Sequence, residues 1–464
     1  MLADADAPTH EGARACGSHD HRRFSVRHDK GVRHLVLLAR TLPEPNVRYV
    51  IHYSFDFKKL HAVTGFSVCL LFSGCGIHGN AAGTTAKTVV IGADFATSGT
   101  DAAAGVPTQN GVELAVEDEQ KKGLPGGYSL RLDTLDDSIG GVHNPEQGAL
   151  NVQTFVADPN VLAVIGPQNS NVARAEIPVT NAAKLVLISP SATSIGLTDD
   201  ATGARSLRQT YPELRNFFRT VMRDDMQGAA DAQFAYRALG SRRAYVIDDN
   251  ESYGKGLADV FVPAFQKLGG TIIDRAHLTK GQQDFIALLT SVASTKPDLI
   301  FYGGVVSTGG AELRRQMLKL GITAKYMGGD GLKDPGFLAA GGAAADGTYS
   351  SQGAPNLSKL PEAKDFLAAY AARFPRQLLG TYSANAYAAA EVAIDAIRGL
   401  MERNGGVAPS REEVLRAIAT STTPNTPIGS ISFNKRGDVT TPVVSIWIVR
   451  DGQFEFLSQV RAQL

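Results

Sequence analysis

Three side chains in this sequence could together hold a small molecule that carries opposite charges. Ser170 and Thr193 each stand in a polar loop that follows an apolar run, and Asp330 stands among glycines after another such run. Hydroxyl groups and the free backbone N–H groups at a helix start bind a carboxylate without any basic side chain. A carboxylate such as that of Asp330 can neutralise an ammonium group.

Each of these residues also has a purely structural interpretation. Serine, threonine and aspartate commonly cap helices at loop junctions, so any one of them alone is weak support for a site. Two hydroxyls on adjacent loops favour a binding site over two separate caps. Tyr253 could stack on a ligand or pack at a hinge. The neighbouring Asp248 and Asp249 are more typical of turn chemistry than of a metal site, so no metal is expected.

The segments 161–165 and 185–188 are the elements that must position the first two loops. Both are short, continuous apolar runs, as buried parallel strands are, and one helix-length segment separates them. Each strand runs directly into a small-residue loop, 166–171 or 189–193. In an open parallel sheet, ligands bind just beyond the carboxyl ends of the strands. We therefore expect Ser170 and Thr193 at one sheet edge.

Strand and helix patterns alternate along the rest of the chain, which predicts doubly wound α/β architecture. The chain has 464 residues, more than one core usually supports, so two lobes are expected. Strands are expected at 88–94, 128–135, 161–165, 185–188, 243–248, 271–278, 298–302, 325–327, 429–433 and 443–449, and helices at 108–122, 145–156, 213–239, 253–268, 283–295, 311–320, 384–401 and 411–419.

The first 86 residues differ from the rest and resemble a targeting region. Eight of the ten histidines and all three cysteines lie before residue 79. Lys58 and Lys59 precede an apolar run, 63–72, which ends close to Cys75 and is too short to span a bilayer. The Ser-Gly-Cys ending resembles a bacterial lipobox, which predicts lipidation of Cys75. The alternative is a secretory signal that is cut near residues 81–86.

The domain prediction follows from this division. Residues 1–57 are expected to be an extension, either absent from the natural protein because the start codon is assigned too early, or genuinely disordered. Residues 58–75 form the signal segment and 76–86 a tether. Lobe 1 is predicted to comprise 87–211 and 354–433, and lobe 2 to comprise 212–353 and 434–464.

Enzyme motifs are missing from the regular part of the chain. The first strand ends in GADFATSG, which has neither the GxGxxG nor the GxxxxGK[ST] spacing of nucleotide-binding loops. There is no GxSxG elbow, and only His143 and His277 follow residue 79. No enzymatic activity and no cofactor are therefore expected. A net charge of zero argues against a nucleic-acid partner.

Six motifs in order resemble one protein family. TVVIGAD with its Ser-Gly loop, VLAVIGP with Ser170, ISPSAT, DDNESYGKG, LIFYGG and YMGGDG are similar to those of type I periplasmic binding proteins. The similarity is greatest to the leucine/isoleucine/valine-binding branch, the solute receptors of branched-chain amino acid ABC transporters. It spans residues 87 to about 460. The resemblance implies two Rossmann-like lobes that are joined by three crossovers and close on one ligand.

The resemblance also assigns roles to residues. Ser170 and Thr193 would hold the ligand carboxylate together with backbone amides, and a backbone group of Ser191 would join them. Asp330 would take the ammonium group, at a position where glutamate is frequent. Tyr253 would cover the ligand from the second lobe. The implied ligand set is Gln168, Asn169, Ser170, Ser191, Ala192, Thr193, Tyr253 and Asp330.

Small residues replace aromatic ones in the expected side-chain pocket. Ala102, Ala103 and Ala104 follow the Ser-Gly pair, and Val305 and Val306 follow the Gly-Gly of a later strand. The pocket is therefore expected to be wider than a leucine site, or shaped differently.

The function implied by the resemblance is that of an exported receptor, either periplasmic or a lipoprotein of the cell surface. It would trap an α-amino acid, branched-chain or related, and deliver it to the permease subunits of an ABC transporter. We expect a monomer that touches the membrane only through its lipid anchor. The alternative is a sensor with the same fold for amides, urea-like solutes or aromatic acids.

Overall fold

The computed structural model describes residues 28–29, 32–33, 87–440 and 443–460. The first two pairs form β1 (His28–Asp29) and β2 (Val32–Arg33), which pair antiparallel. The predicted signal segment 58–75, with Cys75, and the tether lie outside the described residues, as does most of the expected extension 1–57.

The first sheet has five strands, all parallel, in the order β4-β3-β7-β8-β9. The central strand, β7, reads Val-Leu-Ala-Val-Ile and is buried at every position, because helices cover both faces of the sheet. The five strands are β3 (Thr88–Phe95), β4 (Ser129–Asp136), β7 (Val161–Ile165), β8 (Val186–Ser189) and β9 (Phe217–Arg219).

The second sheet has seven strands in the order β11-β10-β12-β13-β14-β17-β18. The first five are parallel, and the last two pair antiparallel at one edge. They are β10 (Arg243–Asp248), β11 (Thr271–His277), β12 (Leu299–Gly303), β13 (Lys325–Gly328), β14 (Thr348–Gln352), β17 (Val444–Arg450) and β18 (Gln453–Val460). Two small hairpins add β5 (Ser138–Ile139) with β6 (Val142–His143), and β15 (Thr422–Thr426) with β16 (Gly429–Ser432).

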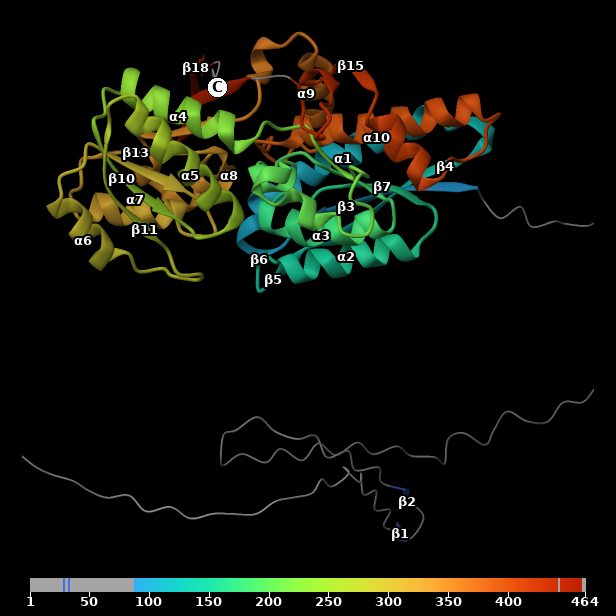
Figure 1. Cartoon of the computed structure of the whole chain (residues 1–464), viewed down its shortest axis with the longest axis horizontal. Coiled ribbons are helices and arrows are strands. Elements are labelled where there is room, and N and C mark those ends of the chain that lie inside the picture. The colour runs from blue at the N-terminus through green and yellow to red at the C-terminus, as the bar shows by residue number, and fades with distance from the viewer. Residues whose placement is uncertain (1–27, 30–31, 34–86, 441–442, 461–464) are drawn as a thin grey trace, which may run out of the picture. The chain divides into compact units, whose positions relative to one another are not determined.

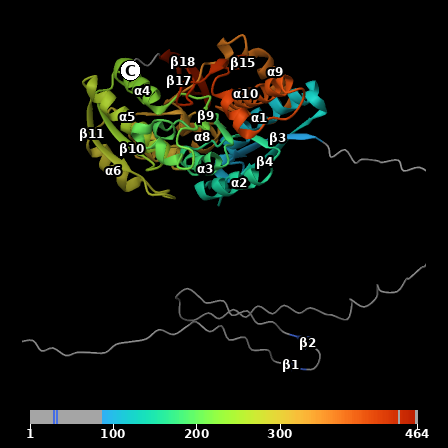
Figure 2. The ribbon, with the colours of Figure 1, turned by 45° about the vertical axis from the view of Figure 1, so that its right-hand side comes forward.

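The helices lie on the faces of these two sheets, which form separate lobes (Figure 1). Figure 2, turned by 45°, shows the same separation. Around the first sheet are α1 (Ala102–Lys122), α2 (Pro145–Ala157), α3 (Ser170–Ala182), α9 (Ala363–Arg373), α10 (Ser383–Arg403) and α11 (Arg411–Ile418). Around the second are α4 (Asp224–Arg237), α5 (Ser252–Lys267), α6 (Ile286–Ser294), α7 (Gly310–Lys319) and α8 (Pro335–Gly341).

Each sheet separates two hydrophobic cores, because successive side chains of a strand point to opposite faces. In β3, Val90 packs in the core under α2 and α3, whereas Ile91 packs in the core with α1 and α10. In β10, Val246 joins the core of α4 and α5, and Ile247 joins that of α6 and α7. Helices therefore cover both faces of each sheet, which is why the central strands are apolar throughout.

The chain passes between the lobes three times, as the resemblance implied. The passages lie between β9 and α4, between β14 and α9, and between β16 and β17. A buried ion pair joins the first passage to the third: Arg219 Nε lies 2.8 Å from Asp438 Oδ1. Arg219 is 0% exposed, so its five donors must be satisfied within the protein, and the carbonyl oxygens of Ala192 and Ser194 accept two of its bonds.

The expected helix over 213–239 is wrong in its first half. Residues 217–219 form β9, which pairs with β8, and α4 begins only at Asp224. Pairing along a buried sheet edge overrides the local helical pattern, and buried Asn216 fixes the entry by donating to Thr180 Oγ1 at 2.9 Å. β9 lies beyond residue 211, where the boundary of lobe 1 was expected. The assignment of ranges to lobes stays a prediction.

Further differences concern one element boundary and elements that were not expected. The helix expected at 108–122 begins earlier, at Ala102, so the three alanines form its first turn and not a loop. β14 at 348–352 was not expected. The chain does not close on the strand near 443–449, because β18 follows it and forms the sheet edge.

Candidate ligand-binding site

A cavity of about 60 Å³ lies between the two lobes, at the carboxyl ends of their strands. Most of its lining comes from the segments after β3, β7 and β8 on one side and after β10, β12 and β13 on the other, and Thr381 and Tyr382, directly before α10, add to it. Both sheets therefore present the edge at which open α/β sheets bind ligands. Six of the eight predicted ligand residues line it: Gln168, Asn169, Ser170, Ser191, Tyr253 and Asp330.

Apart from the Asp101 carboxylate, which His143 binds, the wall from the first lobe is built of neutral hydrogen-bonding groups around the start of α3. Ser170 is the first residue of this helix, and no side chain of its N-cap residue, Asn169, binds the helix N–H groups. The Oγ of Ser170 accepts a hydrogen bond from Ser194 N at 3.2 Å, which leaves its hydroxyl hydrogen free to donate into the cavity. Neutral donors at a helix N-terminus make this wall suitable for an anion.

Ser191 and its neighbours are already engaged with the protein. The Oγ of Ser191 donates to the carbonyl of Gln168 at 2.9 Å, which ties the loop after β8 to the loop after β7. Ala192 N donates to Ser189 Oγ at 2.8 Å. Ala192 and Thr193 are buried but do not belong to the cavity lining. The hydroxyl of Thr193 faces Asp224. A ligand contact of Ala192 or Thr193 stays a prediction.

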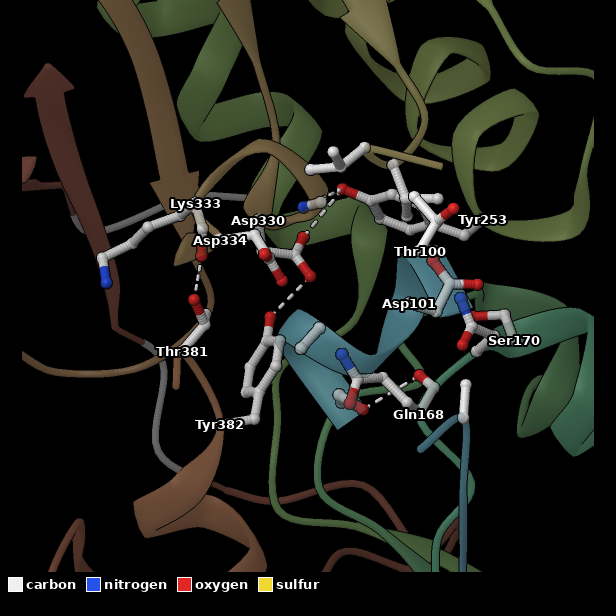
Figure 3. A pocket seen from close by; sticks show the side chains of 17 residues that line it. Thr100, Asp101, Gln168, Ser170, Tyr253, Asp330, Lys333, Asp334, Thr381 and Tyr382 are labelled. Atoms are coloured by element: carbon white, nitrogen blue, oxygen red, sulfur yellow. Dashed lines mark hydrogen bonds between the residues drawn. The ribbon is translucent and has the colours of Figure 1, made fainter. Parts of the chain in front are cut away.

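The wall from the second lobe is organised around the Asp330 carboxylate, which three side chains hold. Figure 3 shows two of them, Tyr253 and Tyr382. Its Oδ1 accepts from Tyr253 Oη at 2.9 Å and from Gln227 Nε2 at 2.6 Å. Its Oδ2 accepts from Tyr382 Oη at 2.5 Å. Burial raises the pKa of Asp330, and these donors oppose that rise by stabilising the charged form. The result is a fixed carboxylate at the cavity.

Tyr253 has a different contact from the one expected of a covering ring. Its hydroxyl donates to Asp330 and accepts from Gly331 N at 3.1 Å, so it holds the loop after β13 in place. Its side chain still lines the cavity. Tyr253 thus supports the carboxylate as well as forming part of the wall.

Apolar, hydroxyl and acidic side chains and one basic side chain complete the lining, and the acidic ones are Asp101 and Asp334. Ala104, Val305 and Val306 line the cavity, as the sequence predicted for its side-chain region, whereas Ala102 and Ala103 do not. Lys333 is a lining residue too, but its Nζ lies 4.3 Å from the ring centroid of Trp447 and points away from the cavity (Figure 3). Burial lowers the pKa of Lys333 to about 8.

Gln227 and Tyr382 are functional residues that the sequence did not reveal. Gln227 lies within α4, and Tyr382 lies directly before α10, 52 residues after Asp330. Nothing in the local pattern of either segment marks a binding residue. Only the return of the chain between the lobes brings Tyr382 to the second-lobe carboxylate.

In the part of the chain that is described, no group of three or more His, Cys, Asp or Glu residues has the geometry to hold a metal ion. Among the same residues, no helix is both long and apolar enough to cross a bilayer.

Comparisons with known proteins agree with this geometry. The family model described as "Periplasmic binding protein" matches residues 88–452. The Leu/Ile/Val-binding protein BraC3 of Rhizobium johnstonii is 32% identical over 363 residues, covering 77% of this chain and 91% of the relative. A leucine binding protein, LivK, from Thermotoga maritima is 27% identical, with a TM-score of 0.69, and the match covers 80% of this chain and 99% of that one.

A second solved structure is similar over the same span. It is the branched-chain amino acid transporter substrate binding protein LivJ from Streptococcus pneumoniae in complex with isoleucine, with 26% identity and a TM-score of 0.70. The match covers 81% of this chain and 100% of that one. This family consists of extracytoplasmic solute-binding receptors and not of enzymes. The chain belongs to the periplasmic binding proteins, in their Leu/Ile/Val-binding branch.

Proposed function

We propose that this protein is an exported receptor that traps an α-amino acid, branched-chain or related, and delivers it to an ABC transporter. Relatives with 26 to 32% identity are named for leucine, isoleucine and valine. The observation that carries the proposal is the Asp330 carboxylate, which is buried at the cavity. Among the described lining residues of the first lobe, no Lys or Arg side chain is available to neutralise it.

The ammonium group of the ligand binds Asp330. A carboxylate has about four acceptor positions, of which side chains of the protein occupy three. The Oδ2 atom beside Tyr382 can therefore accept one more donor. A buried carboxylate gains most from a partner of opposite charge, because hydrogen bonds from neutral donors offset only part of its desolvation cost.

The carboxylate group of the ligand binds the first-lobe wall. The Ser170 hydroxyl and the free N–H groups at the start of α3 donate hydrogen bonds to it. Backbone N–H groups at helix N-termini commonly bind anions in this way. Ala104, Val305 and Val306 then leave an apolar surface for an aliphatic side chain. An amino-acid zwitterion matches the opposite character of the two walls.

Export, lipid anchoring and assembly belong to the same proposal. Lipidation of Cys75 would anchor a monomeric receptor at the membrane, next to the permease subunits it serves. A Cys75→Ser variant should appear in the soluble fraction after cell fractionation, whereas the unaltered chain should sediment with membranes. Retention of the variant in the membrane fraction would exclude this anchor.

A thermal-shift screen tests the ligand class. The panel contains leucine, isoleucine, valine, their α-amides, benzoate and urea. A ligand at 100 times its Kd stabilises the folded protein by about 2.7 kcal/mol, which shifts the Tm by several degrees. Free amino acids should shift the Tm, and their amides should not. A shift with benzoate or urea alone would overturn the proposal in favour of the sensor for aromatic acids or urea-like solutes.

A further inference from the structure

His143 lies outside the ligand cavity and bridges the two lobes through its ring. Its Nδ1 is 2.7 Å from Asp101 Oδ2, and its Nε2 is 2.9 Å from Glu251 Oε2. The side chain is only 1% exposed. Asp101 directly precedes α1 in the first lobe, whereas Glu251 directly precedes α5 in the second. One imidazole therefore contacts a carboxylate of each lobe.

Two hydrogen bonds to Asp101 fix His143 within the first lobe. His143 ends the β5–β6 hairpin, and its backbone N–H also donates to Asp101 Oδ2 at 2.8 Å. Asn171, near the start of α3, donates to the same Glu251 Oε2 that His143 contacts, also at 2.9 Å. Two first-lobe side chains thus meet on one oxygen of the second lobe, and Asp101 itself lines the ligand cavity.

The geometry requires a charged ring. Both nitrogens face carboxylate oxygens, which only accept, so both nitrogens donate and the ring is an imidazolium. Burial favours the neutral ring, but the bonds to Asp101 and Glu251 outweigh burial and raise the pKa of His143 to about 10. Another nearby acid, Asp137, is buried between β4 and β5, and desolvation raises its pKa.

We propose that His143, with Asn171, is an interlobe latch that stabilises the closed form by binding Glu251. When the lobes separate, His143 retains its hydrogen bond to Asp101. The hydrogen bonds of His143 and Asn171 to Glu251 are both broken. Closure therefore gains two charge-assisted hydrogen bonds that involve no ligand atom. Because ligand binding and closure are coupled, this gain adds to the apparent affinity for any ligand that is trapped by closure.

Fluorescence energy transfer between dyes on the two lobes tests the latch without any ligand. All three cysteines precede residue 76, so Cys16, Cys69 and Cys75 are replaced by serine in the full chain. Dyes are placed at Leu150→Cys on α2 and Leu318→Cys on α7, which are each 55% exposed. The Glu251→Gln substitution should lower the closed fraction in the absence of ligand. His143→Gln should lower it less, because Asn171 still binds Glu251, and the double variant should match Glu251→Gln.

A matched control removes a carboxylate from the same lobe without touching the latch. Glu312 pairs with Arg315 inside α7, and Glu312→Gln should leave the closed fraction unchanged. Circular dichroism would show whether the His143→Gln variant folds. If it does not, the Glu251→Gln variant still tests the latch, because the Glu251 side chain is only partly buried. Equal closed fractions in Glu251→Gln, Glu312→Gln and the unaltered chain would overturn the latch.

Titration with L-leucine and L-isoleucine gives a second readout, which depends on the proposed ligand class. The Glu251→Gln variant should bind roughly tenfold more weakly, within the usual range of coupling between closure and binding. Most of the loss should appear as faster dissociation, because the latch acts after closure. Unchanged affinity alongside an unchanged closed fraction would refute the latch. Absence of binding in the unaltered chain would refute the ligand proposal and leave the energy-transfer result standing.

Discussion

The two walls of the cavity differ in how they carry charge. The first-lobe wall around Ser170 offers neutral donors, whereas the second-lobe wall holds the Asp330 carboxylate between Tyr253, Gln227 and Tyr382. Neutral donors lose little when they are buried, but a buried carboxylate is costly until a cation arrives. The difference shows that the two walls offer opposite electrostatic partners, hydrogen-bond donors around Ser170 and a charged acceptor at Asp330.

Removing the charge of Asp330 should have the largest effect on binding. The Asp330→Asn variant should lose about 2–5 kcal/mol of binding free energy for an amino acid, because the ligand ammonium would be buried without a counter-charge. Isothermal titration calorimetry measures this loss. Asp365→Asn, at an exposed position on α9, is the control and should bind normally. Normal binding by the Asp330 variant would show that the walls do not differ as described.

Removing the Ser170 hydroxyl should have the next largest effect. The Ser170→Ala variant should lose about 1.5–3 kcal/mol, as expected for a hydrogen bond to a charged group. Ser191→Ala is its matched control, since the Ser191 hydroxyl is already donated to Gln168. Calorimetry with the free acid should show the larger loss in the Ser170 variant. The reverse order would place the ligand carboxylate on the loop after β8.

Tyr382→Phe should change the pH dependence of binding more than its strength at neutral pH. The Tyr382 hydroxyl stabilises the ionised form of Asp330, whose pKa burial raises. Without it the pKa of Asp330 rises further, and the ammonium group needs the ionised carboxylate. Affinity should therefore fall at a higher pH in the variant as the solution is acidified, with about 1 kcal/mol lost near neutrality. Ligand titrations at a series of pH values from 8 downward measure this difference. Identical affinity curves for the variant and the unaltered protein would show that Tyr382 does not stabilise the ionised Asp330.

The smallest effect is expected at Lys333. Although this residue lines the cavity, its ammonium group lies over Trp447 and not toward the ligand space. The Lys333→Gln variant should bind within about threefold of the unaltered protein, a difference below ~1 kcal/mol. A loss as large as that of Ser170→Ala would mean that the second-lobe wall holds the ligand carboxylate, and the comparison of the walls would be reversed.

Local patterns were sufficient where an element is buried on both sides. The runs at 161–165 and 243–248 coincide with β7 and β10, because a central parallel strand must be apolar throughout. The loops after these strands were found for the same reason, and with them Ser170 and Tyr253. The strand at 217–219 was missed, because only its pairing with β8 makes it a strand.

The sequence by itself determined the α/β class, the family resemblance and the loops that carry the polar cavity residues. These follow from hydrophobic periodicity and from residue types next to strand ends, which are local properties. The tertiary structure alone decided that Tyr382 and Gln227 hold Asp330, that Lys333 points away, and that His143 reaches Glu251 across the lobes. The contact between His143 and Glu251 joins residues 108 positions apart, and no local pattern specifies which distant segments a folded chain brings together.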